Sequence, residues 1–312
     1  MSTGDPGFVH EAALYGSDAE LLNAAVPFLA DGVAAGDTLV FSGSARATDL
    51  VCSALPEPDR VTFLKDGYQR PAAIVQTLLD LFTERRQRSL PGRVRMAGEV
   101  FAAEALGAWE PWAHYEAVIN DLYREFAVTG RCLYDTRTTS PDVLLDVERT
   151  HPLLVTAGTR HVNDRYADPV TFLGERPVPV PDPLELAEPV VRLTAPLPAV
   201  ARLAVTRAAI GTLLDDDAVQ GLVFGVSEVV TNALIHGRAP VELCIWVAPR
   251  RVVATVHDSG PGPTDPRAGL VRTGPEDVGL GLWSTHLLCQ QVVQYADQDG
   301  FTVRLTASPT DS

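Results

Sequence analysis

Apolar positions in the first 160 residues follow two alternating patterns. Short apolar runs bounded by glycine, proline or polar residues predict strands, and they lie at residues 37–43, 60–66, 92–100, 131–137 and 152–158. Between these runs, apolar residues recur every three or four positions, which predicts helices at residues 19–36, 71–89 and 114–130. Alternation of strands and helices is typical of a mostly parallel sheet wrapped by helices. We therefore predict an α/β domain over residues 1–160.

Residues 161–197 interrupt this pattern. The stretch "GERPVPVPDPLELAEP" spaces its prolines too closely for a helix or for a central strand. Such a composition favours a stiff, extended connector. We therefore predict a proline-rich linker here, followed by a second domain over residues 198–312.

The second domain has a different order of elements. Helical periodicity predicts helices at residues 198–214, 217–237 and 279–292. Alternating or continuous apolar runs predict strands at residues 241–248, 251–260, 292–297 and 301–307. Neighbouring strands joined by short turns indicate a mostly antiparallel sheet with its helices on one side, which is an α+β sandwich.

The helix at residues 217–237 carries a polar row. Glu228, Asn232 and His236 follow one another at intervals of four residues, and an α-helix places such positions on one face. Its other positions are largely apolar and can seat the helix in a core. The row is either a solvated surface or the lining of a cleft.

Three further stretches follow in a fixed order. In "HDSGPGP", Asp258 leaves a strand and is followed by Gly260 and Gly262; "GLGL" at residues 279–282 opens a helix; and Thr302 lies on the last strand. Each stretch alone is a weak signal, because glycine turns and aspartates at strand ends are common. Together, a carboxylate, two flexible backbone segments and a helix N-terminus fit a nucleotide.

The chemistry of these residues agrees with that interpretation. Asp258 can accept a hydrogen bond from an exocyclic amine such as N6 of adenine. Asn232 offers a neutral oxygen to Mg²⁺, which takes oxygen ligands and usually shares them with phosphates. Arg267 and Arg272 lie between the two glycine stretches, where they either neutralise phosphate or are ordinary exposed loop arginines.

Residues 198–312 resemble the GHKL ATPase superfamily, and within it the short anti-sigma factor serine kinases of the RsbW type. The motif E-x-x-x-N-A-x-x-H is matched by "EVVTNALIH", D-x-G-x-G by "DSGPG", and the second glycine motif by "GLGL". The resemblance implies a Bergerat sandwich that binds ATP and Mg²⁺. It also implies a sigma factor or an anti-sigma antagonist as the protein partner.

The resemblance assigns roles to individual residues. Asn232 would hold Mg²⁺, Asp258 the adenine, and Glu228 would polarise the attacking nucleophile. The remaining residues of the motifs would line the nucleotide or form the hinges of its lid: His236, Gly260, Gly262, Gly279, Leu280 and Gly281. Thr302 would support the adenine contact.

Three functions stay open at this point. The domain is a serine kinase that switches its partner, a catalytically silent module that binds its partner when ATP is bound, or a sensor histidine kinase. The last requires a phosphoacceptor histidine on a hairpin before the ATPase domain, where this chain has its proline-rich linker. His114 in "HYEAVIND" superficially resembles an acceptor, but it lies on a helix predicted in the first domain.

The first domain resembles the MEDS sensory domain of methanogen and methylotroph sensors, which is related to RecA- and KaiC-like ATPases. The stretches "HEAALYGSDAELL", "GEV", "HYEAVIND", "CLYD" and "THP" carry the resemblance. It implies a domain that senses a small-molecule signal. The stretch "FSGSARATDL" lacks the lysine of G-x-x-x-x-G-K-[ST], so we expect ligand sensing here rather than ATP hydrolysis.

Polar residues of the first domain are candidates for that ligand or for plain structural hydrogen bonds. They are His10, Tyr15, Glu99, Tyr134, Asp135 and His151. His10 and His151 could lie close together at strand ends. The sequence offers no third ligand that would argue for a metal.

Charge and composition limit the partners. A net charge of −15 argues against non-specific binding to nucleic acid or to an anionic membrane, and it is compatible with a basic protein partner or with simple solubility. A homodimer also stays open. The N-terminus shows no signal peptide, and no uncharged apolar segment approaches the ~20 residues that cross a bilayer. Four scattered cysteines with apolar neighbours indicate buried thiols in a reducing compartment. We therefore expect a cytoplasmic protein.

Overall fold

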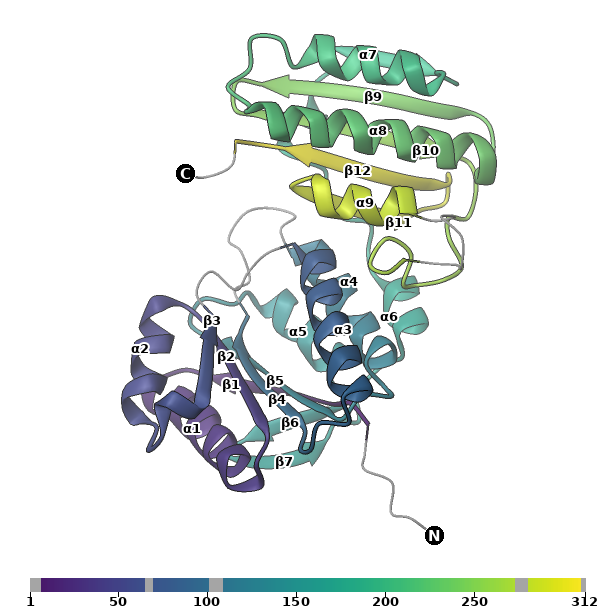
Figure 1. Cartoon of the computed structure of the whole chain (residues 1–312). Helices are drawn as coiled ribbons and strands as arrows, with labels where there is room; N and C mark the ends of the chain where they lie inside the picture. Colours follow the sequence, from purple (N-terminus) through teal and green to yellow (C-terminus); the bar gives the residue numbers. More distant parts are fainter. Residues whose placement is uncertain (1–6, 65–69, 101–108, 273–279, 310–312) are drawn as a thin grey trace. The chain divides into compact units, whose positions relative to one another are not determined.

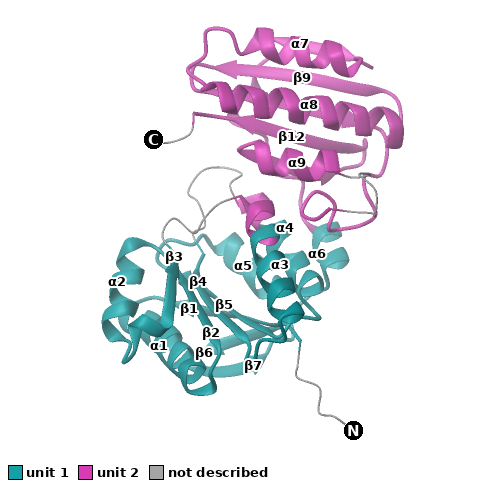
Figure 2. Cartoon of the chain, viewed as in Figure 1, with its two compact units in different colours: residues 1–69, 76–104, 113–175 teal, residues 70–75, 105–112, 176–312 magenta. Residues whose placement is uncertain are grey.

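The computed structural model describes residues 7–64, 70–100, 109–272 and 280–309 of the 312-residue chain. The chain divides into two compact units (Figure 2). The first contains residues 1–69, 76–104 and 113–175, and the second contains residues 70–75, 105–112 and 176–312. Each unit has a sheet of its own, so the fold is described one unit at a time.

The first unit is built on a seven-stranded sheet in the order β3-β2-β4-β5-β1-β6-β7. Its strands are β1 (Val9–Tyr15), β2 (Thr38–Ser42), β3 (Val61–Leu64), β4 (Val94–Glu99), β5 (Val128–Asp135), β6 (Leu153–Thr156) and β7 (Thr159–Val162). Described neighbours pair in parallel except β6 and β7, which are antiparallel. The predicted mostly parallel α/β sheet is confirmed.

Helices cover both faces of this sheet. They are α1 (Asp18–Ala35), α2 (Ala45–Ala54), α3 (Pro71–Gln87), α4 (Trp109–Leu122), α5 (Pro141–Thr150) and α6 (Pro169–Glu175), with a short 3-10 turn at Pro58–Arg60. In Figure 1, α1 and α2 lie on one side of the sheet and α3, α4 and α5 on the other. The side of α1 and α2 holds a core of aliphatic and aromatic side chains from both helices and from β1 to β6.

The predicted helix at residues 114–130 is wrong at its C-terminal end. Helix α4 stops at Leu122, and Gly130 lies inside β5, where it pairs with His10 of β1 and Met96 of β4. Val128 and Thr129 are β-branched and favour the extended backbone. The pairing of β5 between two strands therefore overrides the helical periodicity that runs into it.

The second unit is built on an antiparallel sheet in the order β11-β12-β10-β9-β8. Its strands are β8 (Val191–Thr194), β9 (Val241–Ala248), β10 (Arg251–Asp258), β11 (Gln291–Ala296) and β12 (Phe301–Ala307). Three helices, α7 (Pro198–Ala208), α8 (Asp216–His236) and α9 (Leu280–Leu288), lie on one side of it (Figure 1). This is the predicted α+β sandwich.

Part of the proline-rich segment belongs to this second unit. The 3-10 turn Pro183–Leu186 and strand β8 both lie within residues 161–197. The indole of Trp246 donates to the carbonyl of Ala187 at 2.8 Å, and Leu184 packs against Trp246 and its apolar neighbours. The sheet face without helices carries these apolar side chains, so the extended segment covers them.

Helix α8 is the central helix of the second unit. Its 21 residues are apolar enough to span a membrane by length and composition alone. Its buried side, however, including Leu222, Val226 and Val230, packs into the core above the sheet. Asp215 caps the helix by accepting from the N–H of Ala218 at 2.7 Å. The same helix presents the polar row to the nucleotide motifs.

Candidate functional site

The row on α8 meets the beginning of α9. Glu228 and Asn232 are half-buried, and His236, the last residue of α8, is exposed. Gly281 lies in the first turn of α9, and a Cβ at this position would overlap Oε2 of Glu228. Glu228 and Gly281 of the "GLGL" motif are therefore in contact. Such a contact is expected if both belong to one site.

Asp258 ends β10 and is only 6% exposed. Its Oδ1 accepts two backbone hydrogen bonds, from Gly260 at 2.7 Å and from Arg238 at 2.9 Å. A Cβ at Gly260 would lie 2.6 Å from the same oxygen, and a Cβ at Gly237 would overlap the carboxylate. The carboxylate thus joins the end of α8 to the glycine turn after β10.

Gly237 was not singled out in the sequence. It follows the E-x-x-x-N-A-x-x-H motif directly, and it ends α8 by donating to the carbonyl of Ala233 at 3.1 Å. A Cβ here would overlap the carboxylate of Asp258 and would also lie only 2.6 Å from the carbonyl oxygen of Ala233, so the position has no room for a side chain. The sequence feature that could have identified it is its position directly after the histidine of the motif.

The other motif residues fall into two groups. Gly262 has φ = +76°, a conformation that L side chains rarely adopt, and a Cβ there would overlap the ring of Phe301. Leu280 is the first residue of α9. Gly279 lies outside the described residues. The first glycine motif therefore forms a turn with a positive φ at Gly262, and the second leads into the N-terminus of α9 at Leu280.

Thr302 is not brought to this group. Asp258 pairs with Phe301 in the β10–β12 ladder, and Thr302 pairs with His257. Side chains of successive strand residues point to opposite faces, so Thr302 lies on the face away from Asp258. Its hydroxyl is 3.0 Å from Nδ1 of His257. The expected support of adenine by Thr302 has no basis in this register.

The two loop arginines are engaged locally. The guanidinium of Arg267 bonds to Asp265 at 2.9 Å. Arg272 is exposed, and its guanidinium lies 4.2 Å from the ring centre of Trp283 on α9. Neither contact involves the carboxylate of Asp258 or the polar row of α8.

In the first unit the candidate residues separate onto the two faces of the sheet. Tyr15 and Glu99 share the face of α1 and α2, where the phenol donates to the carboxylate and the N–H of Ser44 donates to Oε2 of Glu99 at 2.8 Å. Burial, and then the nearby carboxylate, raise the pKa of Tyr15 above its usual range. Arg137 bonds to Asp135 and lowers the pKa of that carboxyl group.

Ser44 precedes α2 in the stretch "FSGSARATDL". Its N–H is taken by Glu99, and its hydroxyl accepts from Ala47 at 3.1 Å, which caps α2. A negative carboxylate therefore stands where a phosphate would need free N–H groups. This agrees with the missing lysine in the same stretch.

His10, Tyr134 and His151 share the opposite face. The sequence indicated no third ligand beside these histidines, but the structure places Glu116 of α4 and Cys132 of β5 next to them, with one candidate ligand atom from each of the four residues within 4.8 Å of the others. The sequence reasoning missed both residues, although the stretches "HYEAVIND" and "CLYD" contain them. Their convergence depends on how α4 packs on the sheet.

The four cysteines are all free, as expected. Cys244 and Cys289 are buried, and burial raises the pKa of Cys289 to about 12. Cys52 and Cys132 keep partial exposure, so the prediction of four buried thiols is wrong for these two.

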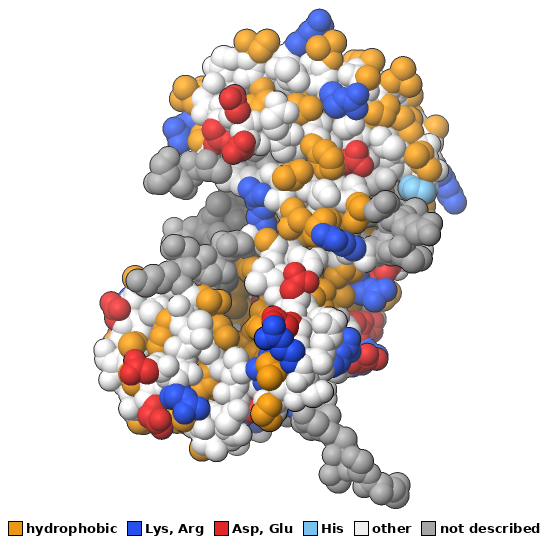
Figure 3. Space-filling view, viewed as in Figure 1, with side chains coloured by type: hydrophobic (Ala, Val, Ile, Leu, Met, Phe, Trp, Pro, Cys, Tyr) orange, Lys and Arg blue, Asp and Glu red, His pale blue; other side chains and the backbone are white. Residues whose placement is uncertain are grey.

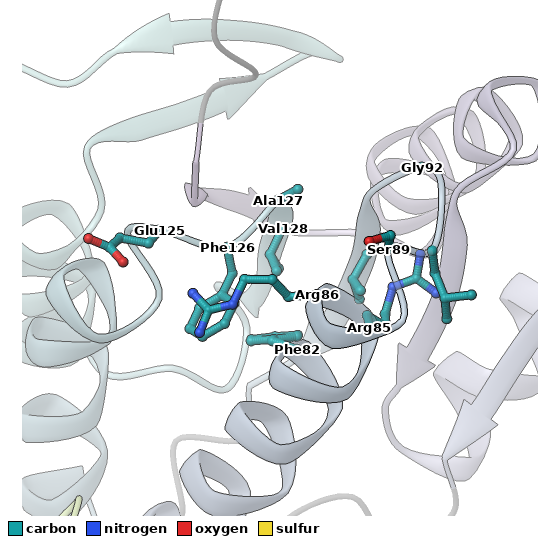
Figure 4. A pocket seen from close by; sticks show the side chains of 11 residues that line it. Phe82, Arg85, Arg86, Ser89, Gly92, Glu125, Phe126, Ala127 and Val128 are labelled. Atoms are coloured by element: carbon teal, nitrogen blue, oxygen red, sulfur yellow. The ribbon is translucent and has the colours of Figure 1, made fainter.

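A cavity of about 320 Å³ opens in the first unit beside the end of α3 (Figure 4). Two arginines line it. Arg85 bonds to the hydroxyl of Thr38 at 2.6 Å, and Arg86 lies 4.9 Å from the ring centre of Phe126. Arg85 is therefore engaged in a hydrogen bond within the protein, and Arg86 stacks on an aromatic ring.

Acidic and basic side chains are interspersed on the face of each unit that Figure 3 presents. The basic side chains form no continuous stripe there. The face in view therefore shows no basic stripe of the kind that nucleic-acid-binding surfaces carry.

Comparison with known proteins agrees with both domains. Residues 9–152 match the family model of the MEDS domain, described as "MEthanogen/methylotroph, DcmR Sensory domain". Residues 193–307 match the model of the histidine kinase-like ATPase domain. The transcriptional repressor DcmR of Methylorubrum extorquens is 26% identical over 153 residues, which are 46% of this chain and 57% of that protein. The chain thus spans little more than half the length of this relative.

Two solved structures show weak overall likeness. The RsbU and RsbW domains of Rv1364c from Mycobacterium tuberculosis are 21% identical, with a TM-score of 0.27 over 39% of this chain and 34% of that chain. EssC (ATPases 2 and 3) from Geobacillus thermodenitrificans is 12% identical, with a TM-score of 0.28 over 56% of this chain and 36% of that chain. Scores this low support no structural argument.

The MEDS match lies mainly within the first unit, and the ATPase match lies within the second. This chain therefore joins an N-terminal MEDS sensory domain to a C-terminal histidine kinase-like ATPase domain.

Proposed function

We propose that the protein is an ATP-dependent regulatory switch of the anti-sigma factor type, in which the MEDS domain receives a signal. The buried carboxylate of Asp258 carries the proposal. Its Oδ1 is occupied by two backbone N–H groups, which fixes the carboxylate and leaves Oδ2 for an outside donor such as the amine of adenine. Glycines at 237 and 260 keep the space beside it free of side chains.

The donor set on α8 suits Mg-ATP. Asn232 would supply a neutral oxygen to Mg²⁺, and Glu228, one turn earlier, would orient the nucleophile. Bound Mg²⁺ neutralises charge on the phosphates, and phosphoryl transfer then depends mainly on positioning. Leu280 and Gly281 at the start of α9 offer backbone N–H groups, and Gly260 and Gly262 the turn that approaches the nucleotide.

The partner follows from the same resemblance. A sigma factor or an anti-sigma antagonist with a phosphorylatable serine is the protein partner we infer, with serine-kinase activity as the reaction. A catalytically silent switch that grips its partner only with ATP bound is the alternative. We also infer a cytoplasmic protein whose first domain is related to RecA- and KaiC-like ATPases and senses a ligand rather than hydrolysing ATP.

Calorimetry with Mg-ATP tests the nucleotide site. Asn232→Ala should remove the Mg²⁺-dependent part of ATP affinity, and Asp258→Asn should remove the preference for adenine over guanine nucleotides. Gln220→Ala is the matched control, because Gln220 is an exposed amide on the same helix. Unchanged ATP binding in both site variants would contradict the assignment.

Phosphoryl transfer to the isolated partner separates the kinase from the silent switch. Glu228→Ala should cost roughly 10²–10⁴-fold in transfer rate, the usual effect of a positioned acid–base group, with ATP affinity nearly kept. If the wild-type protein binds ATP and its partner but transfers no phosphate, the silent switch is correct. Acid-labile phosphohistidine on the chain itself would instead indicate a histidine kinase.

A further inference from the structure

Four side chains from distant parts of the first unit meet in one buried cluster. They are His10 on β1, Glu116 on α4, Cys132 on β5 and His151 directly after α5. One potential ligand atom from each lies within 4.8 Å of the other three. His10, Glu116 and His151 are at most 2% exposed, and Cys132 is the least buried of the four.

Four of the six separations between ligand atoms lie within a few tenths of an ångström of those in a tetrahedral ion site. Oε2 of Glu116 lies 3.2 Å from Nε2 of His10 and 3.6 Å from Nε2 of His151. Sγ of Cys132 lies 3.5 Å from Nε2 of His10 and 3.9 Å from Oε2 of Glu116. Metal–ligand bonds of the usual zinc lengths in tetrahedral geometry put ligand atoms roughly 3.3–3.6 Å apart. The cluster needs only small shifts to surround an ion.

A second layer of contacts orients both histidines. Nδ1 of His10 lies 3.1 Å from Oδ1 of Asn120, whose amide nitrogen donates to the carbonyl of Thr150 at 2.8 Å. Nδ1 of His151 lies 2.9 Å from the carbonyl of Val147. In the tautomer in which each Nδ1 donates to its oxygen partner, each Nε2 lone pair points into the cluster. Metal-binding histidines typically have such outer partners.

The cluster also contains an unpartnered atom. Nε2 of His151 is buried and makes no hydrogen bond. Buried polar atoms are rarely left without a partner, because such an atom loses its hydrogen bond to water and gains nothing. Tyr134 meanwhile donates to Oε1 of Glu116 at 3.1 Å, so Oε2 is the carboxylate oxygen that faces the two imidazoles.

Charge balance points the same way. A divalent cation bound to two neutral imidazoles, one carboxylate and one thiolate forms a neutral group, which suits a buried site.

We propose that His10, Glu116, Cys132 and His151 bind a divalent transition metal ion, with Zn²⁺ as the ion that fits this ligand set. Nitrogen, thiolate and carboxylate ligands in a tetrahedron are typical of zinc, whereas Mg²⁺ and Ca²⁺ require oxygen ligands. Four protein ligands close the coordination sphere. Such an ion would tie β1, β5, α4 and α5 together, and its arrival or loss would alter the packing of α4 on the sheet.

Metal analysis of the full-length protein tests the proposal. The protein is stripped with a chelator, dialysed against Zn²⁺, and its metal content measured by mass spectrometry. One equivalent per chain is expected. Cys132→Ser and His10→Gln should each weaken Zn²⁺ binding by more than the ~10–100-fold that loss of an outer partner costs. Cys52→Ser is the matched control, because Cys52 is a partly exposed thiol on α2, outside the cluster.

Cobalt substitution protects the test against variants that fold poorly. Co²⁺ bound to wild-type protein should show the strong visible absorption of a tetrahedral site and a thiolate charge-transfer band. Both should persist in Cys52→Ser and be absent in Cys132→Ser. If wild-type protein takes up neither ion, or if Cys132→Ser and His10→Gln bind Zn²⁺ as tightly as wild type, the cluster is a hydrogen-bonded group and the proposal fails.

Discussion

Gly262 illustrates how single residues shape the nucleotide site. Its backbone has φ = +76°, and the ring of Phe301 occupies the place of a Cβ. The residue therefore satisfies two requirements at once: a conformation that costs other residues roughly 1–2 kcal/mol, and room for a neighbouring aromatic ring. Asp258, which ends the strand beside Phe301, depends on the same turn.

We predict that Gly262→Ala lowers the free energy of unfolding of the second unit by more than the backbone strain alone. Gly211→Ala is the matched control, because Gly211 has φ = +83° but no atom within 4 Å of a Cβ. Urea denaturation should show a loss of about 1–2 kcal/mol for the control and a clearly larger loss for Gly262→Ala. Equal losses would mean that Phe301 moves aside without cost.

At the scale of single elements, α8 has the largest influence. It begins at a capped N-terminus, buries one face in the core, and carries Glu228 and Asn232 on another face. Gly237, which directly follows its last residue, contacts Asp258. A helix that is held at both ends fixes the spacing between the metal-binding amide and the adenine-binding carboxylate that we propose.

The N-cap offers a test of this role. Asp215→Ala should lower the free energy of unfolding by about 1 kcal/mol, the usual cost of losing an Asp cap, because the N–H of Ala218 loses its acceptor. ATP affinity should change little, because the cap lies at the opposite end of α8 from Asn232. Asp216→Ala serves as the control, since Asp216 follows the cap and retains it. A large loss of ATP affinity in Asp215→Ala would show that the whole helix shifts.

At the scale of the whole molecule, a sensory domain and an ATPase domain share one chain. A sensory domain regulates an ATPase domain only if the two states of the sensory domain differ in their free energy of interaction with the ATPase domain. Such coupling typically amounts to about 1–3 kcal/mol and must be reciprocal for binding. The cluster around Glu116 and the site around Asp258 are the two places where ligands would act.

We predict that Zn²⁺ changes ATP affinity in the full-length protein by about 5–150-fold, and that ATP changes Zn²⁺ affinity by the same factor. Calorimetry on zinc-loaded and chelator-stripped protein measures both directions. The effect should disappear in Cys132→Ser and remain in Cys52→Ser. Identical ATP affinities in the two states of wild-type protein would mean that the domains bind their ligands independently.

The sequence by itself determined whatever depends on neighbours along the chain. Strands β9 and β12 have the predicted bounds, because alternating apolar positions specify them locally. Glu228 and Asn232 share a helix face because they are four residues apart, and Asp258 ends a strand because glycines follow it. Helix spacing and turn chemistry are local, so these features could be predicted without the fold.

Only the tertiary structure decided which distant residues meet. Thr302 lies on the wrong face for Asp258 because the β10–β12 register, rather than its position in the sequence, sets its direction. The requirement for glycine at position 237 becomes visible in its close approach to Asp258, a residue 21 positions later in the chain. Glu116 and Cys132 join His10 and His151 because α4 packs over β1 and β5. Such contacts arise from burial of whole faces against one another, and no periodicity within a single segment encodes them.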